Sequence, residues 1–378
     1  MTAYIYSETS SGGSPQGKTE VESKHPRRTL FLHIGHDKTG STALQTSFTA
    51  SRASLLDKGV NYPATGDDAW EVNLDEMVPC GNARQLLQSK DSFSRQLTTI
   101  TDKQSSVLFS SELLFEDLSS LEDLSFIKSA ATAAGFHDVS ILLFIRNPLP
   151  HGVSVWQQRV KGWQGEVTSL DEWISNKYNT PRKVCDTLKS FAQTPEIKLS
   201  IRLYDTVHSN LHRECEHWLG LPEGTLVVHS ARTNRSLTAS EAELQRCLNQ
   251  RLGPSGKMFG FRLVNRLPDL PADFPVPSRI AQQECLKQLR PALEEVNKVL
   301  PLDQQYSLTL LSVENAGTSY SFNREQIDII AEGIADYCRA KSQPIQTSML
   351  KRIISQMRTI IRWKILGISA WLRGKPSL

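Results

Sequence analysis

A short run of small, hydroxyl-bearing and basic residues near the start of the chain has the composition of an anion-binding loop. The stretch Gly35–Thr42 reads GHDKTGST and stands between an apolar segment and a helix-forming one. Gly35 and Gly40 let the backbone approach an anion closely, because neither carries a Cβ atom. N–H groups at a helix start, hydroxyls and a lysine together bind phosphate-like groups. We therefore predict an anion site formed by Gly35, Lys38, Thr39, Gly40, Ser41 and Thr42.

The position of the lysine distinguishes this loop from the loop of nucleoside triphosphatases. Those loops read G-x-x-x-x-G-K-[ST], with the lysine directly after the second glycine. Here the two glycines have the same separation, but Ser41 follows Gly40 and the lysine lies inside the loop, at Lys38. This order fits poorly with a β/γ-phosphate site that also binds Mg²⁺. A P-loop kinase that uses ATP is therefore the alternative interpretation and not the first one.

A second anion-binding segment follows the most apolar stretch of the chain, Val139–Ile145. Arg146 comes directly after this stretch, and Ser154 stands eight residues later. Arginine binds phosphate in a bidentate manner, and a hydroxyl on the following helix supplies one more donor. The alternative is that Arg146 pairs with a carboxylate at the edge of a sheet. The segment taken alone favours neither interpretation.

The elements that would position these groups alternate between apolar strands and helices. Apolar stretches predict strands at 29–34, Ser105–Ser111, Val139–Ile145, Lys198–Tyr204 and Thr225–Val228. Helical patterns predict helices at Ser41–Lys58, Leu121–Ala134, Ser169–Tyr178, Arg182–Gln193, Asn210–Leu219, Thr238–Arg251, Ser278–Val299 and Asn323–Ala340, with another after Arg146. Residues 59–80 and 253–277 are predicted as irregular surface loops. This order predicts an α/β fold with a central parallel sheet flanked by helices and a mostly helical C-terminal part. Anions then bind at the carboxyl ends of the strands.

The two anion-binding segments resemble those of sulfotransferases that use 3′-phosphoadenosine 5′-phosphosulfate (PAPS). GHDKTGST is similar to their 5′-phosphosulfate loop, and RNPLPHGVSVWQQRVK, which begins at Arg146, is similar to their 3′-phosphate-binding segment. The resemblance extends to bacterial, carbohydrate-type members and covers roughly residues 29–250. It implies a P-loop-related sulfotransferase fold, PAPS as the sulfuryl donor and no metal. It also implies that Lys38 acts at the leaving-group oxygen and that Arg146 and Ser154 bind the 3′-phosphate.

Sulfuryl transfer requires a base that takes the proton from the acceptor hydroxyl or amine. Glu112 follows the predicted strand Ser105–Ser111, so we expect it at the same sheet edge as the anion loop. The resembling family uses either Glu or His as the base, which makes His36 the second candidate. A helix-capping or structural role for Glu112 is equally open. The resemblance implies a carbohydrate, glycan or glycolipid acceptor; a non-catalytic nucleotide- or membrane-binding adaptor of the same fold is the other alternative.

Composition limits the class of protein and of partner. The chain has 378 residues, of which 39% are hydrophobic and 22% charged, as in soluble globular proteins. A net charge of +3 gives no indication of a nucleic-acid partner. Six cysteines without a C-x-x-C pair are typical of a reducing compartment, so we expect a cytoplasmic protein. No metal site is predicted, and the sequence leaves the oligomeric state undetermined.

The two ends of the chain differ from its body. Residues 1–28 are polar and rich in Ser and Gly, which predicts a disordered leader without the apolar segment of a signal peptide. Residues 29–342 are expected to form one sulfotransferase domain. Residues 343–378 carry seven basic and no acidic residues, with apolar residues on one helical side. This tail fits either a helix docked on the body or on a second subunit, or one attached to the inner surface of an anionic membrane.

Overall fold

The computed structural model describes residues 27–64, 69–73, 76–79, 81–83, 89–100, 105–162, 164–228, 235–253, 256, 258–271, 273–312 and 320–342. The predicted basic tail, and the predicted leader except for its last two residues, lie outside the described residues. Among those described, no helix is both long and apolar enough to cross a membrane.

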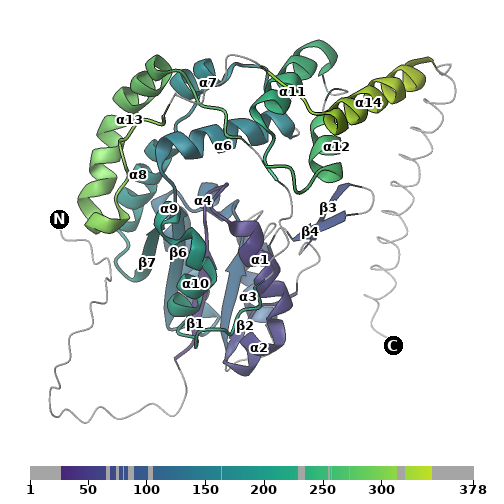
Figure 1. The fold of residues 1–378 in the computed structure, drawn as a ribbon. Helices are drawn as coiled ribbons and strands as arrows, with labels where there is room; N and C mark the ends of the chain where they lie inside the picture. Colours follow the sequence, from purple (N-terminus) through teal and green to yellow (C-terminus); the bar gives the residue numbers. More distant parts are fainter. Residues whose placement is uncertain are drawn as a thin grey trace, which may run out of the picture.

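Five parallel strands form the central sheet, in the spatial order β2–β5–β1–β6–β7 (Figure 1). The strands span Thr29–His33 (β1), Val60–Asn61 (β2), Ser106–Ser110 (β5), Asp138–Ile145 (β6) and Ile197–Leu203 (β7). In register, Leu30 of β1 lies between Val107 of β5 and Val139 of β6. From β1 the chain first builds one side of the sheet and then the other, so the direction of strand addition reverses at β1. Such a switch point is where α/β proteins bind ligands.

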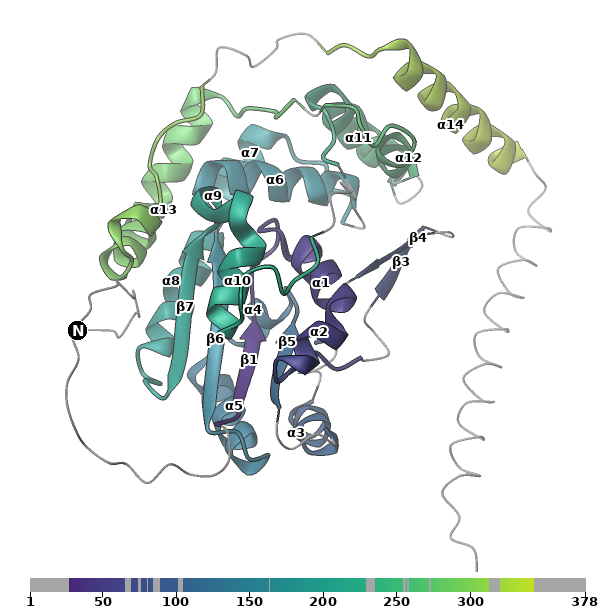
Figure 2. The same ribbon diagram turned by 60° about the horizontal axis from the view of Figure 1, so that its bottom comes forward.

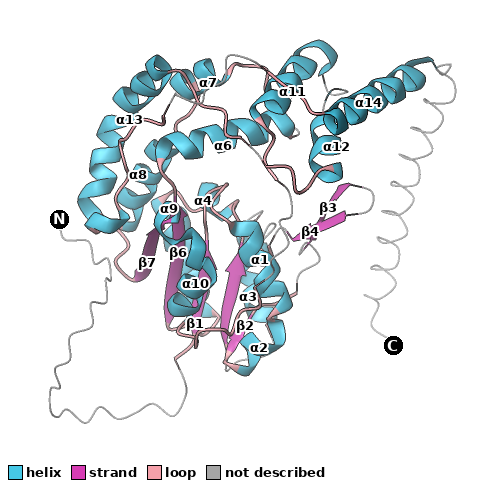
Figure 3. Ribbon diagram, viewed as in Figure 1, coloured by secondary structure: helices cyan, strands magenta, loops and turns pink. Residues whose placement is uncertain are grey.

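Helices cover both faces of the sheet (Figure 2). The first face packs against α1, α2 and α10, and the second against helices that include α3, α5, α6 and α8. The helices span Ser41–Ala50 (α1), Arg52–Asp57 (α2), Lys90–Thr99 (α3), Leu114–Asp117 (α4), Leu121–Ala133 (α5), Pro148–Lys161 (α6), Leu170–Asn176 (α7), Thr180–Phe191 (α8), Tyr204–Val207 (α9), Leu211–Leu219 (α10), Ala239–Leu252 (α11), Met258–Arg266 (α12), Arg279–Val299 (α13) and Arg324–Ser342 (α14). After β7 the described chain contains helices and no strand (Figure 3). The predicted α/β class and the helical C-terminal part are confirmed.

Three local predictions are wrong. Thr225–Val228 is not a strand, because the Glu216 carboxylate and the Ser51 hydroxyl accept the Leu226 and Val227 N–H groups that a sheet would need. Residues 59–80 are not wholly irregular, since they contain β2 and an antiparallel hairpin of β3 (Ala69–Asn73) and β4 (Glu76–Pro79). Residues 253–277 contain α12, whose helical pattern is obscured in the sequence by Gly260.

The helix predicted at Ser41–Lys58 is present as two helices. It is interrupted at Ser51, which separates α1 from α2. The Ser51 hydroxyl accepts a hydrogen bond from the Val227 N–H at 2.8 Å, so a distant segment is anchored at this break. The long helix α6 lies across the carboxyl ends of the strands (Figure 1), where it faces the loop between β1 and α1.

Candidate functional site

The loop between β1 and α1 forms a tight turn with two unusual backbone conformations. Lys38 has a φ of 62°, which residues other than glycine rarely adopt, and Gly40 has a φ of 81°. The Thr39 hydroxyl closes the turn by donating to the His36 carbonyl at 2.6 Å. A Cβ atom on Gly40 would lie 2.6 Å from Cδ2 of Leu211. Both the backbone and the available space therefore require glycine at position 40.

The start of α1 presents polar groups without partners to this loop. No side chain caps α1 within the described chain, and its first turn contains no acidic residue. Ser41 Oγ and His33 Nε2 are buried and have no hydrogen-bond partner among the described residues. A Cβ atom on Gly35 would lie 3.0 Å from His33 Nε2, 3.1 Å from Thr39 Oγ1 and 3.4 Å from Ser41 Oγ. Unpaired polar atoms beside an uncapped helix start are what an anion-binding loop requires.

Lys38 lies where this loop meets α6. Its ammonium donates to Gln158 Oε1 at 2.8 Å, and its carbonyl accepts from Arg146 Nη1 at 3.1 Å. Burial lowers the pKa of Lys38, the carboxylates of Glu112 and Asp37 oppose this change, and the Arg146 charge adds to it. Lys38 is only partly buried and keeps some contact with solvent. A lysine with a lowered pKa is a stronger hydrogen-bond donor to an anion.

Arg146 follows β6 and reaches across the loop toward Lys38. Its guanidinium lies 5.4 Å from the centre of the Tyr204 ring, and its Nε lies 3.8 Å from the Asp205 carboxylate. Nε is buried and has no hydrogen-bond partner in the described part of the chain. The predicted alternative, in which Arg146 pairs with a carboxylate, holds only in part, because 3.8 Å is too long for a hydrogen bond.

Ser154 lies buried in α6, on the helix face that also carries His151 and Gln158. Both of these neighbours contact the anion loop. Between the described side chains of Ser154 and Arg146, however, no hydrogen bond is present. The fold thus places Ser154 on the helix that faces the loop, without joining it directly to the arginine.

Glu112 follows β5 and has the pKa of an effective base. Burial and the negative charge of Asp37 raise its pKa to about 6, while Lys38 and the Ser41 hydroxyl oppose the rise. Ser41 Oγ is close to this carboxylate without meeting the geometry of a hydrogen bond. The helix-capping alternative for Glu112 is not observed, because Leu113 precedes the first residue of α4 and no side chain caps that helix. Glu112 is therefore available for proton transfer.

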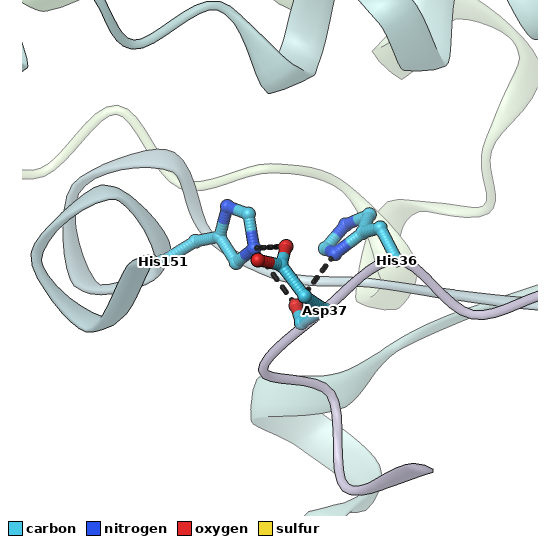
Figure 4. A group of neighbouring side chains, drawn as sticks. All are labelled: His36, Asp37 and His151. Atoms are coloured by element: carbon cyan, nitrogen blue, oxygen red, sulfur yellow. Dashed lines mark hydrogen bonds and ion pairs between the residues drawn. The ribbon is translucent and has the colours of Figure 1, made fainter. Parts of the chain in front are cut away.

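His36, Asp37 and His151 form a cluster beside the loop (Figure 4). His151 Nε2 lies 2.9 Å from the Asp37 carbonyl, and its Nδ1 lies 2.9 Å from the Tyr178 hydroxyl. Because a carbonyl only accepts, Nε2 of His151 carries a proton. By the same argument His36 Nδ1 donates to the Asp37 carbonyl at 3.1 Å. His36 Nε2 then carries a lone pair, with no partner among the described residues.

His36 is nevertheless a weak base in this environment. Burial lowers its pKa to about 3, and the charges of His151 and Arg146 act in the same direction. Burial alone would raise the pKa of Asp37, but the hydrogen bond and charge of His151 bring it down to about 2. The Asp37 side chain is 39% exposed, and solvent screens part of that interaction. Of the two predicted bases, Glu112 therefore suits proton transfer near neutral pH better than His36.

The spacing of this cluster alone would allow a metal ion. One ligand atom from each of His36, Asp37 and His151 lies within 4.8 Å of the others. Both ring nitrogens of His151 already have partners, however. The charges of Lys38 and Arg146 also act on this cluster. A divalent cation would meet these two cations, so we assign no metal to the cluster.

The fold brings most of the predicted site residues together. Lys38, Ser41, Glu112, Arg146 and His36 interact directly or through their charges. The Thr39 hydroxyl instead closes the loop, which leaves its backbone N–H as the group that could bind an anion. The sequence predictions omit His33, His151 and Gln158. Helical spacing from Ser154 would have found the last two, whereas nothing in the local sequence indicates that His33 lies beneath the loop.

No protein-family model matches this sequence, and neither does any curated protein. The function must therefore be inferred from the chemistry of the site.

Proposed function

We propose that this protein is a PAPS-dependent sulfotransferase that moves a sulfuryl group to a hydroxyl or amine of a carbohydrate, glycan or glycolipid. One observation carries the proposal: Lys38, Glu112 and Arg146 meet at the carboxyl ends of three adjacent strands, around the uncapped start of α1. The sheet order, with its switch point at β1, supports a P-loop-related sulfotransferase fold as part of the same proposal.

The start of α1 would bind the 5′-phosphosulfate end of the donor. Backbone N–H groups from Thr39 to Thr42 and the hydroxyls of Ser41 and Thr42 supply the donors, and Ser41 Oγ lacks a partner among the described residues. Lys38 would stabilise the charge that develops on the oxygen between sulfur and phosphorus. To do so, its ammonium has to give up its hydrogen bond to Gln158 and donate to that oxygen instead.

The second phosphate of the donor would bind at Arg146 and Ser154. The unpartnered Arg146 Nε supports this role, because a buried guanidinium nitrogen gains strongly from a phosphate oxygen. Asp205, at 3.8 Å, holds the arginine near this position without occupying its hydrogen-bond donors at Nε. A 3′-phosphate distinguishes PAPS from ATP, so this segment would determine the choice of donor.

Glu112 would act as the base for the acceptor. As the acceptor oxygen attacks sulfur, its proton passes to the Glu112 carboxylate. The bond from sulfur to the phosphate oxygen breaks, and its electron pair leaves with 3′,5′-adenosine bisphosphate. Glu112 then returns the proton to solvent. With a pKa of about 6, the carboxylate is mostly ionised at pH 7 and still basic enough to accept a proton.

The test is to measure the binding of 3′,5′-adenosine bisphosphate by calorimetry. The affinities for 5′-AMP and ATP–Mg²⁺ are measured in the same way for comparison. We expect the bisphosphate to bind most tightly and the Arg146→Ala variant to lose that preference. Arg324→Ala, which removes a surface arginine on α14, is the matched control and should bind like wild type. A preference for ATP–Mg²⁺ would instead indicate a kinase, and no binding of any nucleotide would indicate an adaptor.

A further inference from the structure

The buried His151 of α6 joins the anion loop to a tyrosine outside the proposed site. Its Nε2 lies 2.9 Å from the Asp37 carbonyl (Figure 4), and its Nδ1 lies 2.9 Å from the Tyr178 hydroxyl. A Cβ atom on Gly152 would lie 3.3 Å from the Tyr178 ring, so glycine lets α6 approach this tyrosine closely. The centre of the Tyr178 ring also lies 5.7 Å from that of Trp173 in α7. Packing from two helices thus fixes the position of Tyr178.

Side chains hold three successive carbonyls of the loop. The donors are Thr39 at the His36 carbonyl, His151 at the Asp37 carbonyl and Arg146 at the Lys38 carbonyl. In a trans peptide the C=O and N–H groups point in opposite directions, so the N–H that follows each carbonyl points away from these donors. The N–H groups of Lys38, Thr39 and Gly40 have no partner among the described residues. Successive N–H groups in such a turn form a concave site for an anion.

The peptide that His151 holds, between Asp37 and Lys38, is strained. Lys38 has a φ of 62°, which is unfavourable for a residue with a side chain. Rotation of this peptide by half a turn would return Lys38 to a negative φ. It would also turn the Asp37 carbonyl oxygen to the side where the Lys38 N–H now points, and an oxygen there would repel an anion. His36 Nδ1 donates to the same carbonyl at 3.1 Å, but His36 belongs to the loop and does not tie it to another element.

We propose that His151 and Tyr178 are positioning residues of the anion site: His151 holds the Asp37 carbonyl away from the anion, and Tyr178 fixes the ring of His151. When this ring is neutral, its Nδ1 accepts from the Tyr178 hydroxyl and its Nε2 carries the single proton. Burial raises the pKa of Tyr178 well above its usual value, which keeps the hydroxyl protonated. The inference rests on the proposed function only in taking this loop as an anion site.

The experiment measures, by calorimetry, the affinity of the full chain for inorganic pyrophosphate and for 3′,5′-adenosine bisphosphate. His151→Leu removes the donor to the Asp37 carbonyl. We expect this variant to bind both probes about tenfold more weakly, which is the effect of one buried hydrogen bond. His151→Gln keeps a side-chain N–H donor and should bind both probes within about threefold of wild type. This rescue separates the hydrogen bond from the packing of the ring.

Tyr178→Phe removes one hydroxyl and keeps the aromatic ring. The proton of His151 is then free to exchange between Nδ1 and Nε2, and we expect an about threefold loss of affinity for both probes. The ¹⁵N chemical shifts of His151 should show a protonated Nε2 in the wild type and a mixture of both tautomers in the variant. Tyr306→Phe is the matched control, because Tyr306 is also buried and its hydroxyl has no hydrogen bond to a described residue. It should bind like wild type.

Wild-type affinity in His151→Leu would overturn the inference, and so would equal losses in the Leu and Gln variants. Unchanged ¹⁵N shifts in Tyr178→Phe would overturn the role of Tyr178. A wild-type chain that binds pyrophosphate but not the bisphosphate would refute the proposed function, and the same variants would then decide this inference with pyrophosphate alone. Binding of neither probe would refute both.

Discussion

Burial shifts the pKa values of the two candidate bases, Glu112 and His36, in opposite directions. It disfavours the charged form of each, which raises the pKa of the Glu112 carboxyl to about 6 and lowers that of the His36 imidazole to about 3. A base works best when its pKa lies near the working pH. The same environment therefore makes Glu112 the better candidate base and keeps the His36 ring neutral near pH 7.

Replacement of Glu112 by Gln should remove the base while keeping the shape of the site. We expect turnover to fall by roughly 10²–10⁴-fold, because general base catalysis contributes about that much. The affinity for 3′,5′-adenosine bisphosphate should stay close to the wild-type value. In the wild type, turnover should rise with pH through about 6 as Glu112 loses its proton, and this rise should be absent in the variant.

The control for this variant is Glu116→Gln, which changes an exposed carboxylate of α4 that pairs with Lys183. It should preserve both turnover and its pH profile. Normal turnover in the Glu112→Gln variant would exclude Glu112 from the mechanism and return His36 to consideration.

At the scale of elements, the site depends on how the β1–α1 loop is held between its neighbours. Arg146, after β6, donates to the Lys38 carbonyl, and His151 of α6 donates to the Asp37 carbonyl. On the other side, Gly40 lies against Leu211 of α10. These contacts hold a turn that includes a non-glycine residue at positive φ, Lys38, so its conformation is fixed by its neighbours.

Gly40→Ala should damage this loop more than an ordinary glycine replacement. A positive φ costs an L-residue about 1–2 kcal/mol, and here the added Cβ would also lie 2.6 Å from Leu211. Gly59 provides a matched control, since its φ of 79° is similar and a Cβ there would meet nothing within 4 Å. Denaturant unfolding should show a larger loss of stability for Gly40→Ala than for Gly59→Ala. Equal losses would mean that contact with α10 does not constrain the loop.

At the scale of the whole molecule, a buried ion pair connects the C-terminal helices to α6. Arg235 binds both carboxylate oxygens of Glu241 in α11 and also donates to the Leu263 carbonyl of α12. Gln326 of α14 donates to the same carboxylate at 2.8 Å. The Arg235 carbonyl in turn accepts from Lys161 of α6. One pair of residues thus links three C-terminal helices to the helix that carries the site.

Glu241→Gln should destabilise the protein strongly, by about 3–5 kcal/mol, because it leaves the buried Arg235 without a counter-charge. Burial favours a higher pKa for Glu241, but the bonds from Arg235 and Gln326 outweigh it and the pKa is lowered. Its contribution to stability is therefore present above the pKa of the unfolded chain, about 4, and is lost as the pH falls through the lower folded value. Thermal unfolding between pH 3 and 7 measures both effects.

The control for this buried ion pair is an ion pair on the surface. Glu295→Gln, which breaks an exposed pair with Lys298, should change the unfolding temperature little. A similarly small change in Glu241→Gln would show that the Arg235–Glu241 pair does not hold the C-terminal helices in place.

The sequence predicts the elements whose signals are local. The apolar runs of β1, β5 and β6 follow from residues that are neighbours in the chain. So do the helical patterns of α5–α8, α10, α11, α13 and α14. The sequence does not predict the hairpin β3–β4, because its strands of five and four residues are too short for the alternation of Trp70–Asn73 to stand out from a loop rich in Gly, Pro and acidic residues. Thr225–Val228 resembles a strand by composition, yet its N–H groups bind the side chains of Glu216 and Ser51, which only the folded chain brings near.

By itself, the sequence predicted a candidate anion-binding loop and the residues that flank it, because glycines, hydroxyls and a lysine within eight positions act through the local backbone. Only the tertiary structure decided which distant groups join that loop. Gln158 contacts Lys38 from 120 positions away. The preference for Glu112 over His36 also comes from the fold. A pKa depends on burial and neighbouring charges, and packing sets both.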